Sequence, residues 1–391
     1  MNDKEIKVIA VLELLGANKS LDEVANKYKI SIKTLEGWKE IFLSNADIFF
    51  NGNKSDSYHK EINGTGKVIL DTIDSLNEKL SENKRYEVDT GFKKLNDSTN
   101  GFSKGDLVVV ASRPSIGKSS FVLEIARKAI ERDEAVLFFS FEMKAEQLMS
   151  RLLSSQTSIP LSRLQVGDLT DAQWDLLSQN ADELAKKELF IDDSAYADID
   201  YIRAKVRTFK SEHPNLSMII LDSLNLMSYV KVRENRYEGT AEISKALKQL
   251  AREVDLPIIV TAQLNRGLEN RENKRPVLKD LRDSGTIEDD ADLILFLYRD
   301  DVYREAIEKE KEMIAKAEGK EYESTFQKKP EEEVELIIGK QRNGIRGTVK
   351  LTFQKRFLRF IDYKYDESFE VIYEEDNMDG RNLDNIDLPM I

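Results

Sequence analysis

The stretch from Ser112 to Ser119 reads Ser-Arg-Pro-Ser-Ile-Gly-Lys-Ser, and it constrains the fold of this chain more than any other feature. The apolar run 107–111 before it has the β-branched content of a buried strand, and residues 121–126 after it have helical apolar spacing. A strand, a loop ending in Gly-Lys-Ser and a helix predict a phosphate-binding loop, in which backbone N–H groups at a helix N-terminus face an anion. The alternative is a Gly-Lys-Ser that merely starts a helix.

The loop pattern assigns a role to each polar group. Lys118 is expected to reach the terminal phosphates of a nucleotide, and the Ser119 hydroxyl to ligate Mg²⁺. Ser112 stands where such a loop usually has its first glycine, so a slightly different backbone path is expected there. The predicted nucleotide-binding residues are Ser115, Ile116, Gly117, Lys118, Ser119 and Ser120.

From residue 86 onward, strand and helix patterns alternate. This order predicts an α/β fold with a mostly parallel sheet that is covered by helices on both faces. The expected strands are 107–110, 135–140, 189–191, 218–221, 257–261, 293–298 and 334–338, followed by a hairpin of 348–353 and 357–360. The expected helices include 143–154, 172–186 and 199–210.

Composition limits the chemistry that this chain can perform. It has no cysteine and only two histidines, which lie far apart, so carboxylates, lysine, arginine and a phosphate-bound metal must carry any reaction. No apolar run approaches the roughly 20 residues of a membrane span, and the start lacks the apolar core of a signal peptide. A soluble, cytoplasmic protein without a membrane partner is therefore expected.

Charge and linker patterns divide the chain into four parts. The formal net charge is −13, but residues 366–391 hold nine acidic residues against one arginine, which leaves −5 for the other 365 residues. A local basic channel is therefore compatible with the acidic total. The predicted parts are a helix-turn-helix-like unit 1–55, a linker 56–85 with the amphipathic helix 68–80, a catalytic domain 86–365 with a charged insertion at about 303–333, and the acidic tail 366–391.

The N-terminal unit has the pattern of a helix-turn-helix. Ser20 and Glu23 form a capping-box pair before a short helix, Ile30 lies in the turn, and Leu35 and Trp38 are the apolar anchors of the next helix. The recognition helix lacks a net positive face, because its lysines are offset by glutamates. DNA binding and protein docking or assembly are both open readings of this unit.

Polar residues end three of the predicted strands. Asp222 follows 218–221, Glu142 follows 135–141, and Gln263 closes 258–263. Ligands in open α/β sheets bind at the carboxyl ends of strands, so these three residues are expected beside the phosphate loop. Asp222 is the candidate for the Mg²⁺ shell, Glu142 for polarising the attacking water, and Gln263 for sensing the γ-phosphate.

Nine sequence blocks add a second, longer pattern to the phosphate loop. They are Gly91–Leu95, Gly101–Leu107, Arg113–Ser119, Ser140–Met143, Ala241–Ser244, Gln263–Arg266, Asp280–Gly285, Asp290–Leu293 and Gly339–Gly344. In sequence and in order, these blocks resemble the RecA-type motor domain of DnaB-family replicative helicases over about residues 86 to 363. Helix 68–80 stands where that family has a linker helix, which packs on the adjacent motor domain. The short N-terminal unit departs from the family's larger helical domain.

The resemblance implies a role for matching residues. ATP and Mg²⁺ are the implied cofactors, with Lys118 and Glu142 as catalytic groups, Ser119 and Asp222 at the metal, and Gln263 as the sensor. Lys340 and Arg342 are implied to act in trans on the neighbour's nucleotide. The resemblance places Arg282, Asp283 and Gly285 in the family's DNA-contact block, with Asp283 where glutamate is more usual. Arg266 is a further candidate DNA-binding residue, from the basic stretch 264–282. Independently, residues 264–282 carry a net charge of +3, which suits contact with phosphates.

The sequence therefore predicts an ATP-dependent DNA helicase of the DnaB type. The resemblance implies a closed ring, typically a hexamer, that translocates 5′ to 3′ on single-stranded DNA during replication. Implied partners are single-stranded DNA, further copies of the chain, and a loader, primase or other replication proteins. Two alternatives stay open: a regulatory or assembly ATPase recruited to DNA by its helix-turn-helix unit, and a RecA-like recombination ATPase.

Overall fold

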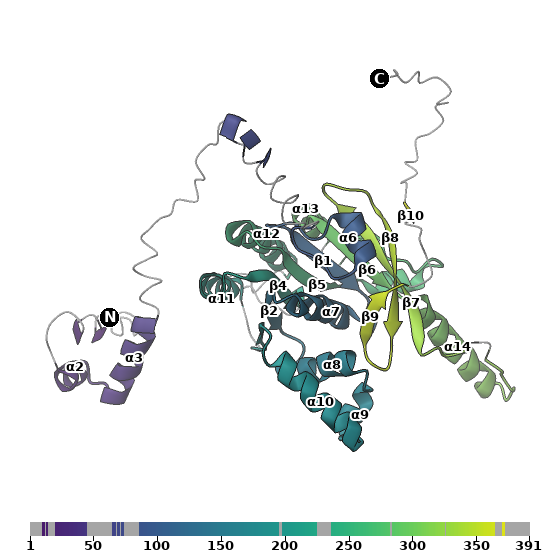
Figure 1. Cartoon of the computed structure of the whole chain (residues 1–391), viewed down its shortest axis with the longest axis horizontal. Coiled ribbons are helices and arrows are strands. Elements are labelled where there is room, and N and C mark those ends of the chain that lie inside the picture. The colour runs from purple at the N-terminus through teal and green to yellow at the C-terminus, as the bar shows by residue number, and fades with distance from the viewer. Residues whose placement is uncertain are drawn as a thin grey trace. The chain divides into compact units, whose positions relative to one another are not determined.

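The computed structural model describes residues 10–11, 13–14, 20–44, 65–67, 69–70, 72–73, 86–194, 198–224, 236–281, 284–324, 326–363 and 370–371. Two compact units, Met1–Glu82 and Asn83–Ile391, are distinguished by their internal contacts (Figure 1). Some predicted features lie outside the described residues. These are Arg282, Asp283, most of helix 68–80 and most of the tail 366–391.

The first unit contains the two helices expected of a helix-turn-helix. Helix α2 (Leu21–Tyr28) begins at the predicted capping box: the Ser20 hydroxyl accepts the Glu23 N–H at 3.3 Å, and the Glu23 carboxylate accepts the Ser20 N–H at 3.1 Å. Lys29 adopts the left-handed conformation that ends α2 before α3 (Ile32–Ser44). A small apolar core joins these helices to an earlier helical segment, and its buried residues are Ala10, Val11, Val24, Ala25 and Leu35.

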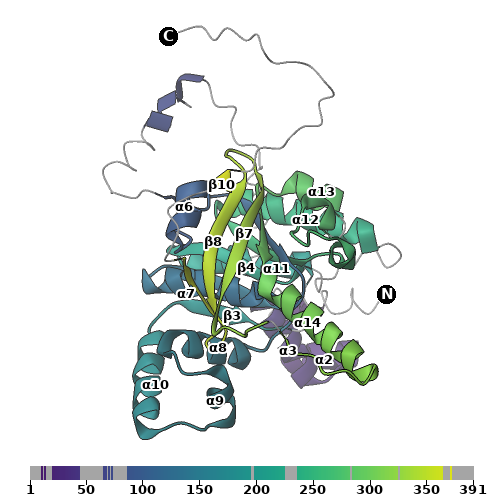
Figure 2. The ribbon, with the colours of Figure 1, turned by 90° about the vertical axis from the view of Figure 1, so that its right-hand side faces the viewer.

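The second unit is built on one ten-stranded sheet (Figures 1 and 2). The order is β10-β8-β7-β6-β1-β5-β4-β2-β3, with β9 paired to β8. The six strands from β6 to β3 are parallel and β7 to β10 are antiparallel, so the predicted mostly parallel α/β fold is confirmed. The bounds are β1 Leu107–Ser112, β2 Ala135–Ser140, β3 Leu189–Asp192, β4 Leu216–Asp222, β5 Ile258–Gln263, β6 Leu293–Tyr298, β7 Glu331–Gln341, β8 Gly347–Gln354, β9 Arg359–Asp362 and β10 Glu370–Val371.

Helices cover both faces of the sheet, and alternate residues of the central strand β1 point into two separate cores. Leu107 and Val109 pack on the side of α11 (Ile199–Glu212) and α12 (Arg236–Val254). Val108 and Val110 pack on the opposite side, against α6, α7 and α8. The bounds of the last three helices are Lys93–Thr99, Lys118–Glu131 and Ala145–Thr157. A strand that is buried on both faces explains the continuous apolar run before the phosphate loop.

Two predicted boundaries near the C-terminal hairpin were wrong. The strand expected at 357–360 is β9 (Arg359–Asp362), because residues 355–358 form a turn in which Leu358 has a φ of 52°. The charged insertion does not extend to 333, because β7 begins at Glu331. Its first residues alternate between exposed and buried, with Glu332 turned inward. Glutamate is depleted in strands, so composition concealed this start.

Three helical segments project from the sheet. The insertion consists mainly of one solvated helix, α14 (Asp300–Ala317), which has no buried residue. On another side, α9 (Leu161–Val166) and α10 (Asp171–Leu184) extend beyond α8 (Figures 1 and 2). The remaining elements are the 3-10 helices η2 (Arg266–Asn270) and η3 (Leu278–Asp280) and the short α13 (Ser284–Asp290). Within the described residues, no helix is both long enough and apolar enough to cross a membrane.

Candidate nucleotide site

The phosphate loop joins the carboxyl end of β1 to the N-terminus of α7. Ser115 and Gly117 adopt left-handed conformations, with φ of 65° and 117°. A Cβ on Gly117 would lie 3.1 Å from the Phe360 ring, so both conformation and space favour glycine there. Ser112 needs no glycine, because it is an ordinary residue of β1 whose hydroxyl donates to the Arg113 carbonyl at 2.8 Å. The predicted change of path at Ser112 is therefore unnecessary.

Helix α7 begins at Lys118, directly after the loop, so its first N–H groups lie at the end of the loop. The first helical bond of this end runs from the Phe121 N–H to the Gly117 carbonyl at 2.9 Å, so the N–H groups of the preceding residues have no intrahelical acceptor. Lys118 and Ser119 are half-buried here. Ile116 differs from the prediction, because its side chain is buried in the core and only its backbone can face a nucleotide.

Parallel strands bring three predicted polar residues to the same edge. Gln263 pairs in register with Ser112 of β1, and Asp222 pairs with Ser140, two residues before Glu142. Asp222 is fully buried, and one of its oxygens accepts the Thr261 hydroxyl at 2.5 Å. Its other oxygen is buried without a hydrogen-bond partner among the described residues. An unsatisfied carboxylate oxygen beside a phosphate loop fits a hydrated Mg²⁺ shell.

The loop and the strand ends enclose a cavity of about 730 Å³. Of the predicted site residues, Lys118, Ser119, Glu142 and Gln263 line this cavity, and Asp222 is not among its lining residues. No group of three acidic or histidine side chains suited to a metal occurs in the described part of the chain. A cation would therefore depend on the Ser119 hydroxyl, the Asp222 carboxylate, water and the phosphates themselves, which is how Mg²⁺ is commonly held at such sites.

Arg151 of α8 also lines this cavity, and the sequence reasoning missed it. Burial lowers the pKa of Arg151 and of Lys118, whereas the carboxylates of Asp222 and Glu142 act in the opposite direction on both. Neither cation has a hydrogen bond or ion pair to another described residue. Two desolvated cations that lack fixed partners favour the binding of an anion between them. One sequence feature could have indicated Arg151: it lies on a mostly neutral helix that begins just after Glu142.

The side chains of two buried arginines join the loop to other segments of the chain, and neither role was predicted. Arg113 donates to the Glu269 carboxylate at 2.7 Å and to the Leu264 carbonyl at 2.8 Å. Arg299 donates to the carbonyls of Ser115 at 3.3 Å and Ile116 at 3.0 Å. Arg299 is itself fixed by the buried Glu332 at 2.8 Å, and that carboxylate also accepts Lys355 at 2.6 Å. These bonds preorganise the loop without occupying its N–H groups.

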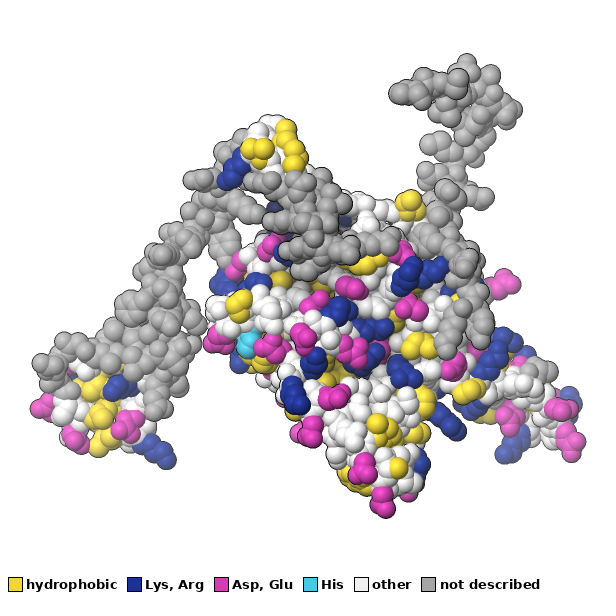
Figure 3. Space-filling model, in the orientation of Figure 1, with side chains coloured by type: hydrophobic (Ala, Val, Ile, Leu, Met, Phe, Trp, Pro, Cys, Tyr) yellow, Lys and Arg dark blue, Asp and Glu magenta, His cyan; other side chains and the backbone are white. Residues whose placement is uncertain are grey.

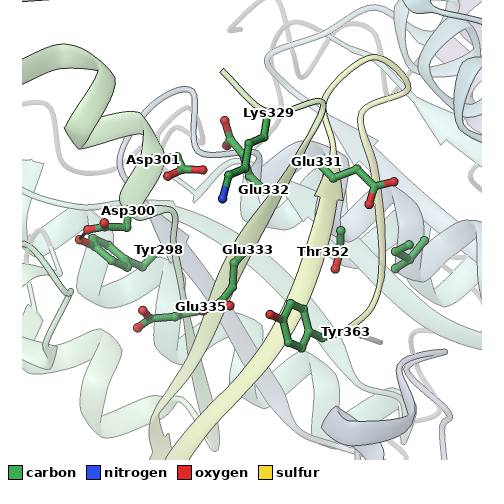
Figure 4. Close-up of a pocket in the computed structure, with 11 residues that line it drawn as sticks. Tyr298, Asp300, Asp301, Lys329, Glu331, Glu332, Glu333, Glu335, Thr352 and Tyr363 are labelled. Carbon is green, nitrogen blue, oxygen red and sulfur yellow. Dashed lines mark hydrogen bonds between the residues drawn. The ribbon is translucent and has the colours of Figure 1, made fainter. Parts of the chain in front are cut away.

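A second cavity has Glu332, the partner of Arg299, in its wall (Figure 4). It has a volume of about 400 Å³, and Lys329 is the basic residue of its wall. Six carboxylates also line this second cavity, and they would repel a polyphosphate. The candidate nucleotide site is therefore the cavity beside Lys118. The acidic residues of the second cavity are Asp300, Asp301, Glu331, Glu332, Glu333 and Glu335.

Lys340 and Arg342 lie at the opposite edge of the sheet from the phosphate loop. Lys340 pairs with Ile294 near the start of β6, and Leu293 pairs with Val108 near the start of β1. Val108 and the loop are separated by four residues of strand, about 13 Å at the usual rise. Arg342 contacts Asp292 at 2.9 Å and the Asp289 carbonyl at 3.1 Å, and Lys340 donates to the Glu288 carbonyl. Neither side chain meets the cavity of its own chain.

The predicted DNA-binding residues are only partly described. Arg266 begins η2, directly after β5, and is exposed. Gly285 lies in α13, while Arg282 and Asp283 lie outside the described residues. The basic charge of residues 264–282 is partly neutralised, because Arg271 pairs with Asp280 at 2.6 Å and Arg275 pairs with Glu335 at 2.5 Å.

Comparisons with known proteins agree with this arrangement. A family model of the DnaB-like helicase C-terminal domain matches residues 87–362. The replicative DNA helicase DnaB of Helicobacter pylori (strain ATCC 700392 / 26695) is 42% identical over 321 residues, which are 77% of this chain and 66% of that protein. The replicative DNA helicase DnaC of Bacillus subtilis (strain 168) is 40% identical over 299 residues, 75% of this chain and 61% of that protein. The chain thus spans somewhat less than two thirds of these relatives.

Two solved structures are also similar. One is an ATPase domain with a TM-score of 0.66 and 32% identity, and the match covers 76% of this chain and 99% of that domain. The other is a DnaB-like replicative helicase whose structure was solved together with its interactions with primase. It has a TM-score of 0.64 and 26% identity, and the match covers 90% of each chain.

Proposed function

Because the chain belongs to the DnaB-like helicase family, we propose that it is a Mg²⁺- and ATP-dependent DNA helicase that assembles into a ring and translocates on single-stranded DNA. The observation that carries this proposal is the separation of two incomplete half-sites. Lys118, Glu142 and Asp222 meet at the carboxyl edge of the sheet, whereas Lys340 and Arg342 lie at the amino edge. A site completed by the next subunit makes hydrolysis depend on assembly.

Each residue at the carboxyl edge has a distinct task in phosphoryl transfer. The N–H groups at the start of α7 and the Lys118 ammonium bind the β- and γ-phosphates. Glu142 orients the attacking water and accepts its proton, and such a base contributes about 10²- to 10⁴-fold to rate. Ser119 and Asp222 would hold Mg²⁺, which neutralises charge on the transferred phosphoryl group. Gln263 responds to the γ-phosphate, because it lies in register with Ser112.

Ring assembly is supported by exposed apolar side chains on two separate segments. Val166 of α9 is 76% exposed and Trp174 of α10 is 50% exposed, and Figure 3 reveals hydrophobic side chains on this projection. In the linker, Ile69, Leu70 and Ile73 are exposed as well. Large exposed apolar side chains of this kind are candidates for an interaction site. The occupant proposed for the α9–α10 face is the linker segment of an adjacent copy.

Contact with DNA is assigned to the segment that begins at Gln263. Arg266 is exposed next to the nucleotide edge, and Arg282, Asp283 and Gly285 follow in the block that resembles the family's DNA contacts. Positive charge without base-reading geometry suits binding of the DNA backbone. The helix-turn-helix unit is left as a docking or loading element whose partner is a loader, primase or duplex DNA.

The test is ATP hydrolysis with and without single-stranded DNA, together with strand displacement from a forked duplex. The native chain is compared with Lys118→Ala and Arg342→Ala, and DNA binding is measured for all three. The proposal requires DNA-stimulated hydrolysis, fork opening by the native chain, and loss of both in each variant. If the native chain hydrolyses ATP without opening the fork, and Arg342→Ala hydrolyses ATP at the native rate, the regulatory or assembly ATPase becomes the better account.

A further inference from the structure

The side chain of Arg113 connects the phosphate loop to the segment 264–281. Arg113 is buried and is not among the residues that line the nucleotide cavity. Its guanidinium donates from Nε to Glu269 at 2.7 Å and from Nη1 to the Leu264 carbonyl at 2.8 Å. These partners follow Gln263 in the chain, so Arg113 bonds to the region that comes after the γ-phosphate sensor. A planar, charge-assisted pair of this kind fixes geometry as well as distance.

The loop end of this connection is tied to the backbone that binds phosphate. The Arg113 carbonyl accepts the Ser112 hydroxyl at 2.8 Å and the Ile116 N–H at 3.4 Å. Ser112 in turn accepts the Leu264 N–H through its carbonyl at 3.1 Å. A change of loop backbone on nucleotide binding must therefore move the Arg113 side chain, or break bonds of a buried cation, which is costly.

The other end of this connection is segment 264–281, which is closed by bonds between its first and last residues and can therefore transmit such a movement. Leu264 bridges to Leu281, and the Asn265 N–H donates to the Asp280 carbonyl at 2.8 Å. Buried Asp280 also accepts Arg271 at 2.6 Å and the Val277 N–H at 2.9 Å. The two ends of the segment are thus held together, and a displacement at Leu264 reaches Leu281, which directly precedes Arg282 in the sequence.

We propose that Arg113 is a positioning residue that transmits the nucleotide state of the phosphate loop to segment 264–281 through Glu269 and the Leu264 carbonyl. The DNA part of this role rests on the proposed function, because it assigns DNA contact to the same segment. Arg299 provides the contrast. It holds the other side of the loop to Glu332 of β7, inside the sheet, and so acts as a fixed support while Arg113 reaches a peripheral segment.

The test variant is Glu269→Ala, and its matched control is Glu272→Ala. Glu269 is 45% exposed, so its loss should leave the fold intact, and it is not part of the nucleotide cavity. Glu272 is an exposed acid of the same segment with no hydrogen bond or ion pair to another described residue. Both variants remove one negative charge from the segment. A difference between them therefore isolates the pair with Arg113.

The first measurement is hydrogen exchange of the peptide 264–281 with and without the non-hydrolysable analogue AMP-PNP. The analogue should slow exchange in the native chain and in Glu272→Ala, and the slowing should fall by about fivefold or more in Glu269→Ala. A merely structural role would raise exchange with and without nucleotide alike. Equal nucleotide-dependent slowing in all three proteins, or none in the native chain, would overturn the proposal.

The second measurement is the stimulation of ATP hydrolysis by single-stranded DNA. Glu269→Ala should lose most of the stimulation by DNA, and this loss should exceed any change that the variant causes in the DNA-free rate or in the KM for ATP. Native stimulation in Glu269→Ala, with an unchanged exchange response, contradicts the coupling while the helicase proposal stands. If no protein is stimulated by DNA but the exchange response still requires Glu269, the helicase proposal fails and the coupling within the chain stands.

Discussion

The two edges of the central sheet both carry many charges, but these charges are satisfied differently. At the amino edge, Asp292 accepts Lys248, Arg342 and the Leu107 N–H, and Lys248 also donates to the Gly105 carbonyl at 2.8 Å. At the carboxyl edge, Lys118 and Arg151 have no hydrogen bond or ion pair within the described chain. One oxygen of Asp222 is likewise buried and unsatisfied there.

The contrast distinguishes charged groups that stabilise the fold from charged groups that are available to bind a ligand. Paired charges at the amino edge lower the cost of burial and join the starts of the strands. Unpaired charges at the carboxyl edge are destabilising on their own, and they are retained where a ligand can satisfy them. Substitutions at one edge should therefore change stability, and substitutions at the other should change activity.

The largest effect is expected from Lys118→Ala at the carboxyl edge. ATP hydrolysis should fall by about 1,000-fold or more, because the proposed role of the Lys118 ammonium is to neutralise the charge of the β- and γ-phosphates. The melting temperature should stay the same or rise, since a desolvated cation without a partner is removed. Steady-state hydrolysis and thermal unfolding measure the two quantities. A large fall in melting temperature would contradict the distinction drawn between the two edges.

The next effect tests Arg342 at the amino edge, which we propose completes the nucleotide site of the adjacent subunit. Arg342→Ala should lower hydrolysis by about 100- to 1,000-fold, with a stability change below about 1 kcal/mol, because its side chain is 48% exposed. Mixing Arg342→Ala with Lys118→Ala should restore part of the activity, because some interfaces then combine an intact lysine with an intact arginine. No recovery in rings that contain both variants would exclude action in trans.

A smaller effect, on stability alone, is expected from Lys248→Met. The change removes a charge-assisted bond to Asp292 and the bond to Gly105, which should cost about 2 kcal/mol in the free energy of unfolding. Denaturant unfolding measures this cost. The ATPase rate per folded molecule should be native, and Lys309→Met on the exposed α14 is the control that should leave both quantities unchanged.

The smallest effect concerns the pH dependence of the amino edge. Burial, and then repulsion from Asp292, raise the pKa of Asp106 to about 6 from 3.8. The folded chain keeps this proton where the unfolded chain has lost it, so Asp106 reduces stability as pH rises from about 4 to about 6. Asp106→Asn should flatten that part of the stability profile by about 1 kcal/mol, allowing for screening. An identical profile in both proteins would contradict the shift.

Much of the fold and the core of the candidate site could be predicted from the sequence. The phosphate loop is a local pattern, and apolar runs that end at or just before Asp222, Glu142 and Gln263 signal buried parallel strands. The prediction failed where composition misled, as at the glutamate-rich start of β7, whose Glu332 is buried by its bond to Arg299.

The sequence alone determined which groups could bind phosphate and at which strand ends they stand, because both depend on short stretches of chain. Only the tertiary structure decided which other residues hold these groups in place and which of these groups have no hydrogen-bond or ion-pair partner. Arg113 finds Glu269 156 residues away, Arg299 finds the Ile116 carbonyl 183 residues away, and Arg151 enters the cavity from a separate helix. The sheet register likewise puts Arg342 beyond the reach of its own cavity. Such contacts follow from packing between distant segments, which no local pattern encodes.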